Sequence, residues 1–121
     1  MKRIPAIASG AIILFAASAA IACDYPERPH IPDGNTASKE ELLAAKADVT
    51  GFLNAVDEYL RCVESEEHEA IQALEDPDPE VVKNRNDMLN KKFDAANEEK
   101  ALVGEQFNQQ VRAFNAKQKS E

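Results

Sequence analysis

Residues 38–75 read SKEELLAAKADVTGFLNAVDEYLRCVESEEHEAIQALE, and this stretch predicts one long amphipathic helix. Its apolar side chains recur at steps of three and four, which places them on one stripe of a helix with about 3.6 residues per turn. Ser38 and Glu41 match a capping box, in which each side chain accepts a hydrogen bond from a backbone N–H at the helix start. A seven-residue repeat within the stripe suits long, nearly antiparallel packing against a second helix. The stripe consists of Leu42, Val49, Phe52, Leu53, Val56, Leu60, Val63, Ala70, Ile71 and Leu74.

A second helix is predicted over residues 79–117, after a break at Pro77. Proline disfavours helix at the residue before it, and Asp78 followed by Pro79 matches an N-cap and a first helical position. The apolar residues again recur at threes and fours, namely Val82, Leu89, Phe93, Ala96, Val103, Phe107, Val111 and Phe114. We therefore predict an all-α fold, an antiparallel two-helix hairpin of about 38–75 and 79–117.

A simple antiparallel register about this break gives specific neighbours across the hairpin. It places Leu53 opposite Leu102 and Gly51 opposite Gly104. Paired glycines permit a close backbone approach or a shared bend, although each glycine costs about 1 kcal/mol relative to alanine. We therefore expect the two glycines to face each other across the seam.

Residues 1–22 are typical of a secretory signal peptide. A basic start, Met1-Lys2-Arg3, is followed by an apolar run over 11–17 and by the small-x-small site Ala20-Ile21-Ala22. The predicted organisation is thus a signal peptide over 1–22, a proline-rich strap over 23–37 and a helical hairpin over 38–121. The mature protein would lie in the periplasm or be secreted, with no membrane span after signal removal.

Cys23 at the expected cleavage point leaves two alternatives open. In an oxidising compartment, the only two cysteines of the chain, Cys23 and Cys62, are most simply read as one disulfide. A lipoprotein signal also ends at a cysteine, which is then acylated, although such signals usually carry Leu, Val or Ile where this chain has Ala20. In that alternative the protein is a lipoprotein anchored through Cys23, and Cys62 is a lone thiol.

Residues 23–37 predict an extended strap that lies along the first helix. Its prolines, Pro26, Pro29 and Pro32, recur every third residue, which matches the three residues per turn of polyproline II. From Cys23 to Ser38 is about 46 Å at polyproline II rise, and the helix from Ser38 to Cys62 is about 36 Å long. The strap can therefore turn near Gly34 and reach Cys62. Its alternative role is a Pro-x-x-Pro ligand for an aromatic groove of another protein.

Four short motifs accompany this geometry. They are Cys-Asp-Tyr-Pro at 23–26, Ile-Pro-Asp-Gly at 31–34, the Ala-Ser-Lys-Glu-Glu helix start, and Tyr59 followed by Cys62. Together they resemble a family of small secreted proteobacterial proteins of unknown function, over about residues 23–65. The resemblance implies export and the pairing of the two cysteines. It implies no functional residue, because the family has no assigned activity.

Charge and composition exclude several classes of function. The net charge is −8, and removal of Lys2 and Arg3 with the signal leaves 12 basic against 22 acidic residues, or −10. Binding to a nucleic-acid backbone or to anionic lipid needs a basic face, so neither nucleic acid nor a membrane surface is an expected partner. No catalytic constellation, phosphate loop or Cys/His metal spacing is present, so we expect a non-enzymatic protein without a cofactor.

The predicted hairpin tip is the most biased stretch of the sequence. From Cys62 to Val82 there are eight acidic residues and no Lys or Arg. Carboxylates next to a histidine are candidate ligands for a divalent cation, although the stretch lacks the glycine turn of a calcium loop. The candidates are Glu64, His68, Asp76, Asp78 and Glu80. A solvated acidic surface is the alternative, and no defined metal site is predicted.

The sequence thus predicts an exported helical protein that acts by contact with an unknown protein partner in the cell envelope. One alternative is an acidic divalent-cation-binding protein, and another is a small periplasmic chaperone-like protein, which rests on fold analogy alone. A two-helix hairpin buries little surface, so either the strap fills one groove of a monomer or two hairpins pair as a homodimer.

Overall fold

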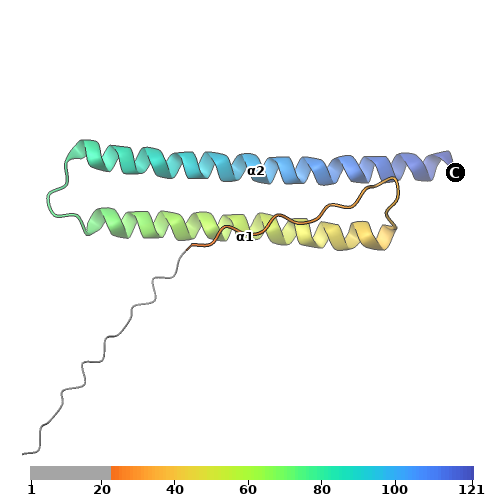
Figure 1. Ribbon diagram of the computed structural model, residues 1–121, viewed down its shortest axis with the longest axis horizontal. Helices are drawn as coiled ribbons and strands as arrows, with labels where there is room; N and C mark the ends of the chain where they lie inside the picture. Colours follow the sequence, from red (N-terminus) through yellow and green to blue (C-terminus); the bar gives the residue numbers. More distant parts are fainter. Residues whose placement is uncertain (1–22) are drawn as a thin grey trace, which may run out of the picture.

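A computed structural model, which describes residues 23–121, confirms the all-α two-helix hairpin. Helix α1 spans Lys39–Gln72 and helix α2 spans Pro79–Ser120, and the two lie side by side and antiparallel (Figure 1). Residues 23–37 are not helical and run back along the hairpin from its open end, as an extended strap that contains one turn. The predicted signal peptide, residues 1–22, lies outside the described residues.

Both helices begin at the caps that the sequence predicts. The Ser38 hydroxyl accepts a hydrogen bond from the Glu41 N–H at 3.1 Å, and the Glu41 carboxylate accepts one from the Ser38 N–H at 2.7 Å. At the start of α2, the Asp78 carboxylate accepts a hydrogen bond from the Glu80 N–H at 2.9 Å. These side chains satisfy N–H groups that have no partner within the helix, so they fix where each helix begins.

The helix ends differ from the predicted ones. Helix α1 ends at Gln72 rather than near residue 75, and α2 continues to Ser120 rather than to about 117. Asp76 has a φ of 45°, in the left-handed region that ordinary side chains rarely adopt. The chain needs this conformation to reverse direction just before Pro77, which also disfavours helix at Asp76. Residues 73–75, predicted as the last turn of the first helix, therefore belong to the loop instead.

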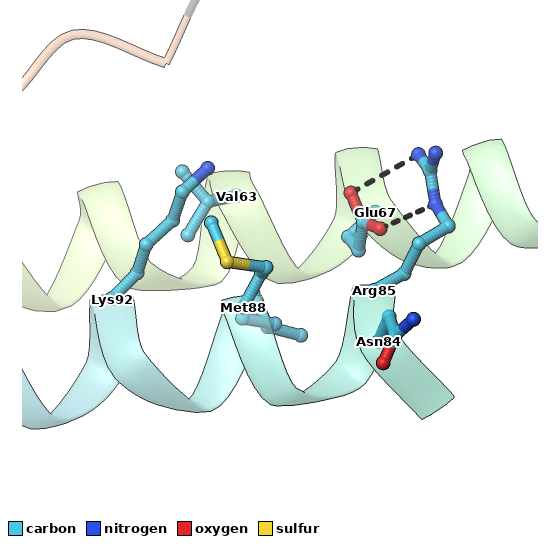
Figure 2. A pocket seen from close by; sticks show the side chains of 7 residues that line it. Val63, Glu67, Asn84, Arg85, Met88 and Lys92 are labelled. Atoms are coloured by element: carbon cyan, nitrogen blue, oxygen red, sulfur yellow. Dashed lines mark hydrogen bonds and ion pairs between the residues drawn. The ribbon is translucent and has the colours of Figure 1, made fainter. Parts of the chain in front are cut away.

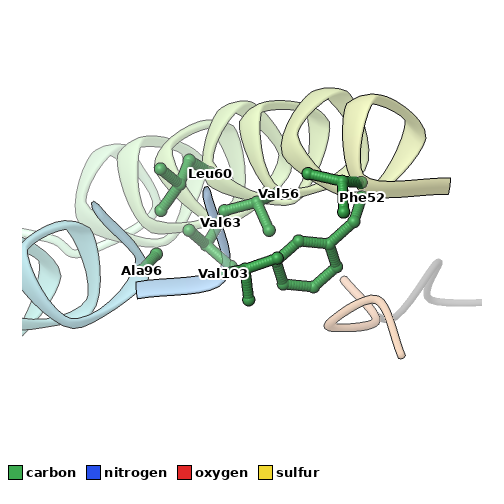
Figure 3. Packing of buried hydrophobic residues seen from close by; sticks show 7 residues of the cluster. Phe52, Val56, Leu60, Val63, Ala96 and Val103 are labelled. Carbon is green, nitrogen blue, oxygen red and sulfur yellow. The ribbon is translucent and has the colours of Figure 1, made fainter. Parts of the chain in front are cut away.

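The core is one row of apolar side chains along the seam between the helices (Figure 3). Val56 from α1 and Val103 from α2 are fully buried, and Phe52, Leu60 and Ala96 surround them. Two predictions drawn from the register are wrong. Leu102 is 47% exposed because its neighbour Val103 faces the seam instead. A Cβ added to Gly51 or Gly104 would meet no atom within 4 Å, so these glycines mark no close approach of the helices.

Burial is confined to one half of the hairpin. All buried side chains of α1 lie between Leu42 and Val63, and none of residues 64–95 is buried. The predicted stripe continues through Ala70, Ile71 and Leu74, but these residues are only half-buried or exposed. The half of the hairpin that packs well is the half along which the strap lies (Figure 1). Cys23 and Ile31 of the strap pack directly against the core.

Between residues 23 and 121, neither helix has the length and apolarity that crossing a membrane requires.

Candidate functional site: the strap groove and its extension

The strap is fastened to α1 by a disulfide. Cys23 and Cys62 are bonded, with their Cα atoms 5.7 Å apart, and the described residues contain no free cysteine. A sulfur atom in a disulfide cannot also carry a lipid, so the structure matches the first of the two alternatives for Cys23. The bond fixes the point along α1 at which the strap begins.

Tyr25 packs the strap onto aromatic side chains of α1. Its ring lies edge-on to Tyr59 with centroids 5.0 Å apart, and edge-on to Phe52 at 6.4 Å. Aromatic pairs prefer this geometry because the positive ring edge meets a negative ring face. Desolvation raises the pKa of the Tyr25 phenol, with smaller contributions from Glu99 and Tyr59, whereas Arg28 lowers it. A tyrosine phenol is already neutral at neutral pH, and the raised pKa extends this neutral range to higher pH.

The strap also contacts α2, so it bridges both helices. Arg28 Nε lies 3.1 Å from a carboxylate oxygen of Glu99, and the Gly34 N–H donates to Oε1 of Gln110 at 2.9 Å. Gly34 is buried, and an added Cβ would lie 2.8 Å from the carbonyl carbon of Gln110 and closer still to its oxygen. Only glycine fits there, because the strap turns directly on the backbone of α2.

Beyond Cys23, toward the hairpin tip, the groove continues without the strap. A hollow of about 280 Å³ is lined by α1 and α2 alone: Val63, Glu67, Asn84, Arg85, Met88, Leu89 and Lys92 (Figure 2). Lys92 also lines the neighbouring hollow beside Tyr25 and Tyr59, so the two hollows adjoin. We call the hollow beyond Cys23 the groove extension. It is an open groove of mixed apolar and polar character.

One ion pair joins the two helices within the groove extension. Arg85 Nε lies 2.7 Å from Oε1 of Glu67, and the Arg85 guanidinium also donates to Oε2 at 3.4 Å (Figure 2). The Nε atom is buried and its contact with Oε1 is not aligned as a hydrogen bond, so that contact is mainly electrostatic. Both side chains are partly exposed, and such pairs contribute only about 0–1 kcal/mol.

The five candidate cation ligands are not brought together. Asp78 caps α2, and the His68 ring contacts the Gln72 side chain at 3.0 Å. Glu64 lies on α1, Asp76 in the loop and Glu80 in the first turn of α2, and all three are exposed. In the part of the chain that the structure describes, no three His, Cys, Asp or Glu side chains gather as metal ligands would.

An apolar hollow of about 380 Å³ lies at the open end of the hairpin. Its lining combines lysines at the start of α1 with apolar and amide side chains of both helices: Lys39, Leu42, Leu43, Lys46, Phe107, Asn108, Val111, Phe114 and Asn115. No strap residue lines it. This hollow therefore provides a comparison for the groove extension, because it is formed by the same two helices at the opposite end of the hairpin.

Sequence reasoning missed the exposed apolar row on α2. Val81, Met88, Ala95 and Leu102 recur every seven residues and all are exposed. Met88 lines the groove extension and Ala95 lines the hollow beside Tyr25, so the row flanks the strap groove. The seven-residue spacing is present in the sequence, but the longer stripe of apolar residues that forms the core dominates the pattern of this helix.

Comparison of the chain with protein-family models, curated proteins and solved structures found no match. The resemblance to small secreted proteobacterial proteins therefore stays a prediction from the motifs in residues 23–65.

Proposed function

We propose that this chain is an exported, non-catalytic protein that acts by contact with another protein in the cell envelope, outside the cytoplasm. The observation that carries the proposal is the groove extension together with the exposed side chains beside it. A soluble monomer rarely leaves large apolar side chains grouped along a groove unless something docks there. Here Met88 lines the groove extension and is 57% exposed, and Val81, seven residues before it on α2, is also exposed.

Compartment and chemistry support the same proposal. A disulfide between cysteines 39 residues apart suits an oxidising compartment, as does the signal-like start of the sequence. The two histidines are both exposed, and His68 is engaged by Gln72. The phenol of Tyr25 is protonated at neutral pH, as its ordinary pKa of 10.0 already requires, so it is not a base there. These features favour a contact surface over a reaction centre.

Photo-crosslinking in the native envelope tests this proposal. A photoreactive amino acid is placed at Met88, beside the groove extension, and separately at Leu43, which is 55% exposed at the open end. Contact with a partner predicts a defined adduct at one of these positions. The absence of an adduct at both, or turnover of a substrate by the purified protein, would contradict the proposal.

A further inference from the structure

We propose that the groove extension binds an extended segment of a partner protein, in which apolar side chains alternate with lysine or arginine. This inference rests on the proposed function and names the partner's chemistry. Its occupant would continue the line of the strap beyond Cys23 toward the hairpin tip.

The groove extension is continuous with the interface that the strap already makes. The strap shows that the groove between α1 and α2 accepts extended, proline-rich backbone. It is held there by an aromatic contact, an ion pair and a hydrogen bond from the Gly34 N–H to the side chain of Gln110. The groove continues past Cys62 with a hollow lined by the same two helices. From Cys62 to Gln72, α1 advances about 15 Å, which is room for about five extended residues at about 3.1 Å each.

Beyond Cys62, the described residues place no third segment over the two helices as the strap does in the other half. Along the strap, the seam side chains of α1 are buried, whereas none of residues 64–95 is buried. Val63 and Leu89 line the groove extension, and Met88 beside them is 57% exposed. An apolar side chain placed there would cover Met88, whose flexible thioether adapts to varied partners.

Charged side chains flank the groove extension on both helices. Glu66 and Glu69 follow Cys62 by four and seven residues, so they continue the side of α1 on which the strap is bonded. No ion pair engages either carboxylate among residues 23–121. On the facing helix, Arg85 is already paired with Glu67. The α1 wall of the groove is therefore acidic, whereas Lys92, which lines the α2 side next to the strap, has no ion pair among residues 23–121 either. The acidic α1 wall favours basic side chains on a partner that lies against it. A second copy is disfavoured because it would bring two acidic tips together.

A peptide titration tests the proposal on the full oxidised chain that begins at Cys23. The probe is fluorescein-labelled Lys-Leu-Pro-Lys-Leu-Pro, whose lysines, leucines and prolines each occupy one edge of a polyproline II helix. Fluorescence anisotropy at low salt should show saturable binding. The matched probe Glu-Leu-Pro-Glu-Leu-Pro should bind at least about tenfold more weakly, because its charge opposes the acidic wall.

Variants then test whether the probe binds at the groove extension. Met88→Gln, which keeps helix propensity and adds no charge, should weaken binding about tenfold. Leu43→Gln, an equally exposed leucine at the open end, is the control and should leave binding unchanged. Glu66→Gln with Glu69→Gln should weaken binding about threefold and flatten its dependence on salt. All of these side chains are exposed, and circular dichroism checks that each variant folds.

Several outcomes would overturn the inference. They are absence of saturable binding, equal binding of the acidic probe, and an undiminished affinity of Met88→Gln. Sedimentation that shows a dimer broken by Met88→Gln would assign the groove to a second copy instead. Crosslinks at Leu43 with none at Met88 would leave the proposed function standing while this inference fails.

Discussion

The half of the hairpin along the strap and the half beyond Cys62 are built from the same two helices but differ in packing. Along the strap, Val56 and Val103 are fully buried, and Cys23 and Ile31 close the core from a third side. Beyond Val63, no residue is buried until Ala96 on the return helix. Two helices alone enclose little volume, so the strap supplies the third side that turns a seam into a core.

Reduction of the disulfide should produce the largest change, and it should act on the half along the strap. A closed loop of this length stabilises the fold by about 4 kcal/mol, mainly by restricting the unfolded chain. We therefore expect reductant, or Cys62→Ser, to lower the free energy of unfolding by about that amount. Urea unfolding followed by circular dichroism measures it. An unchanged midpoint after reduction would mean that the strap contributes little.

Substitution of Gly34 should have the next largest effect. The Cβ of Gly34→Ala would collide with the backbone of Gln110, so the strap must lift from α2 at a cost of about 1–3 kcal/mol. Gly51→Ala is the matched control, because its Cβ meets open space within a helix and should stabilise the protein by about 1 kcal/mol. Thermal unfolding of both variants checks the opposite signs. A stabilising Gly34→Ala would show that the strap does not rest on α2.

Matched valine truncations compare the two halves directly. Val56→Ala removes a fully buried side chain along the strap and should lower the free energy of unfolding by about 2 kcal/mol. Val82→Ala removes a half-buried side chain near the tip and should cost well under about 1 kcal/mol. Urea unfolding of both variants measures the difference. Equal losses would mean that both halves are equally well packed.

The titration of Tyr25 should give the smallest effect. Its pKa is raised above 10.0 in the folded chain, mainly by desolvation. The folded state then holds the phenolic proton more tightly than the unfolded state does. This contribution to stability is complete below pH 10.0 and is lost as pH rises through the raised pKa.

The pKa of Tyr25 is measured by titrating the phenolate absorbance of the natural chain and of Tyr25→Phe and taking the difference between the two curves. Glu99→Gln should lower the Tyr25 pKa toward its ordinary value, and Arg28→Gln should raise it further. A Tyr25 pKa below 10.0 would show that the ring is not desolvated on the helices.

Local sequence signals predicted the parts of the fold that local chemistry decides. The caps at Ser38 and Asp78 and the stripes of apolar residues depend on neighbours a few positions away, so the two helices could be read directly. The direction of the strap followed from comparing its length with that of α1. The inference about the strap also depended on one distant contact, the pairing of Cys23 with Cys62, which the presence of only two cysteines suggested.

Features that depend on rotation about a helix axis were not predicted correctly. Leu102 and Val103 are adjacent apolar residues, and which one faces the seam depends on how α2 is turned against α1 and the strap. The groove extension depends on where the strap ends relative to both helices. Met88 and Arg85 therefore looked like ordinary surface residues in the sequence.

Hydrogen exchange of the oxidised chain, read by residue, tests the central claim that the strap makes the core. We predict slow exchange in α1 from Val49 to Val63 and in α2 from Leu89 to Phe107, where side chains form the core or pack against it, with fast exchange over residues 64–88. On reduction, the slow region should become fast. Uniform protection along both helices, or protection greatest at the tip, would contradict the account.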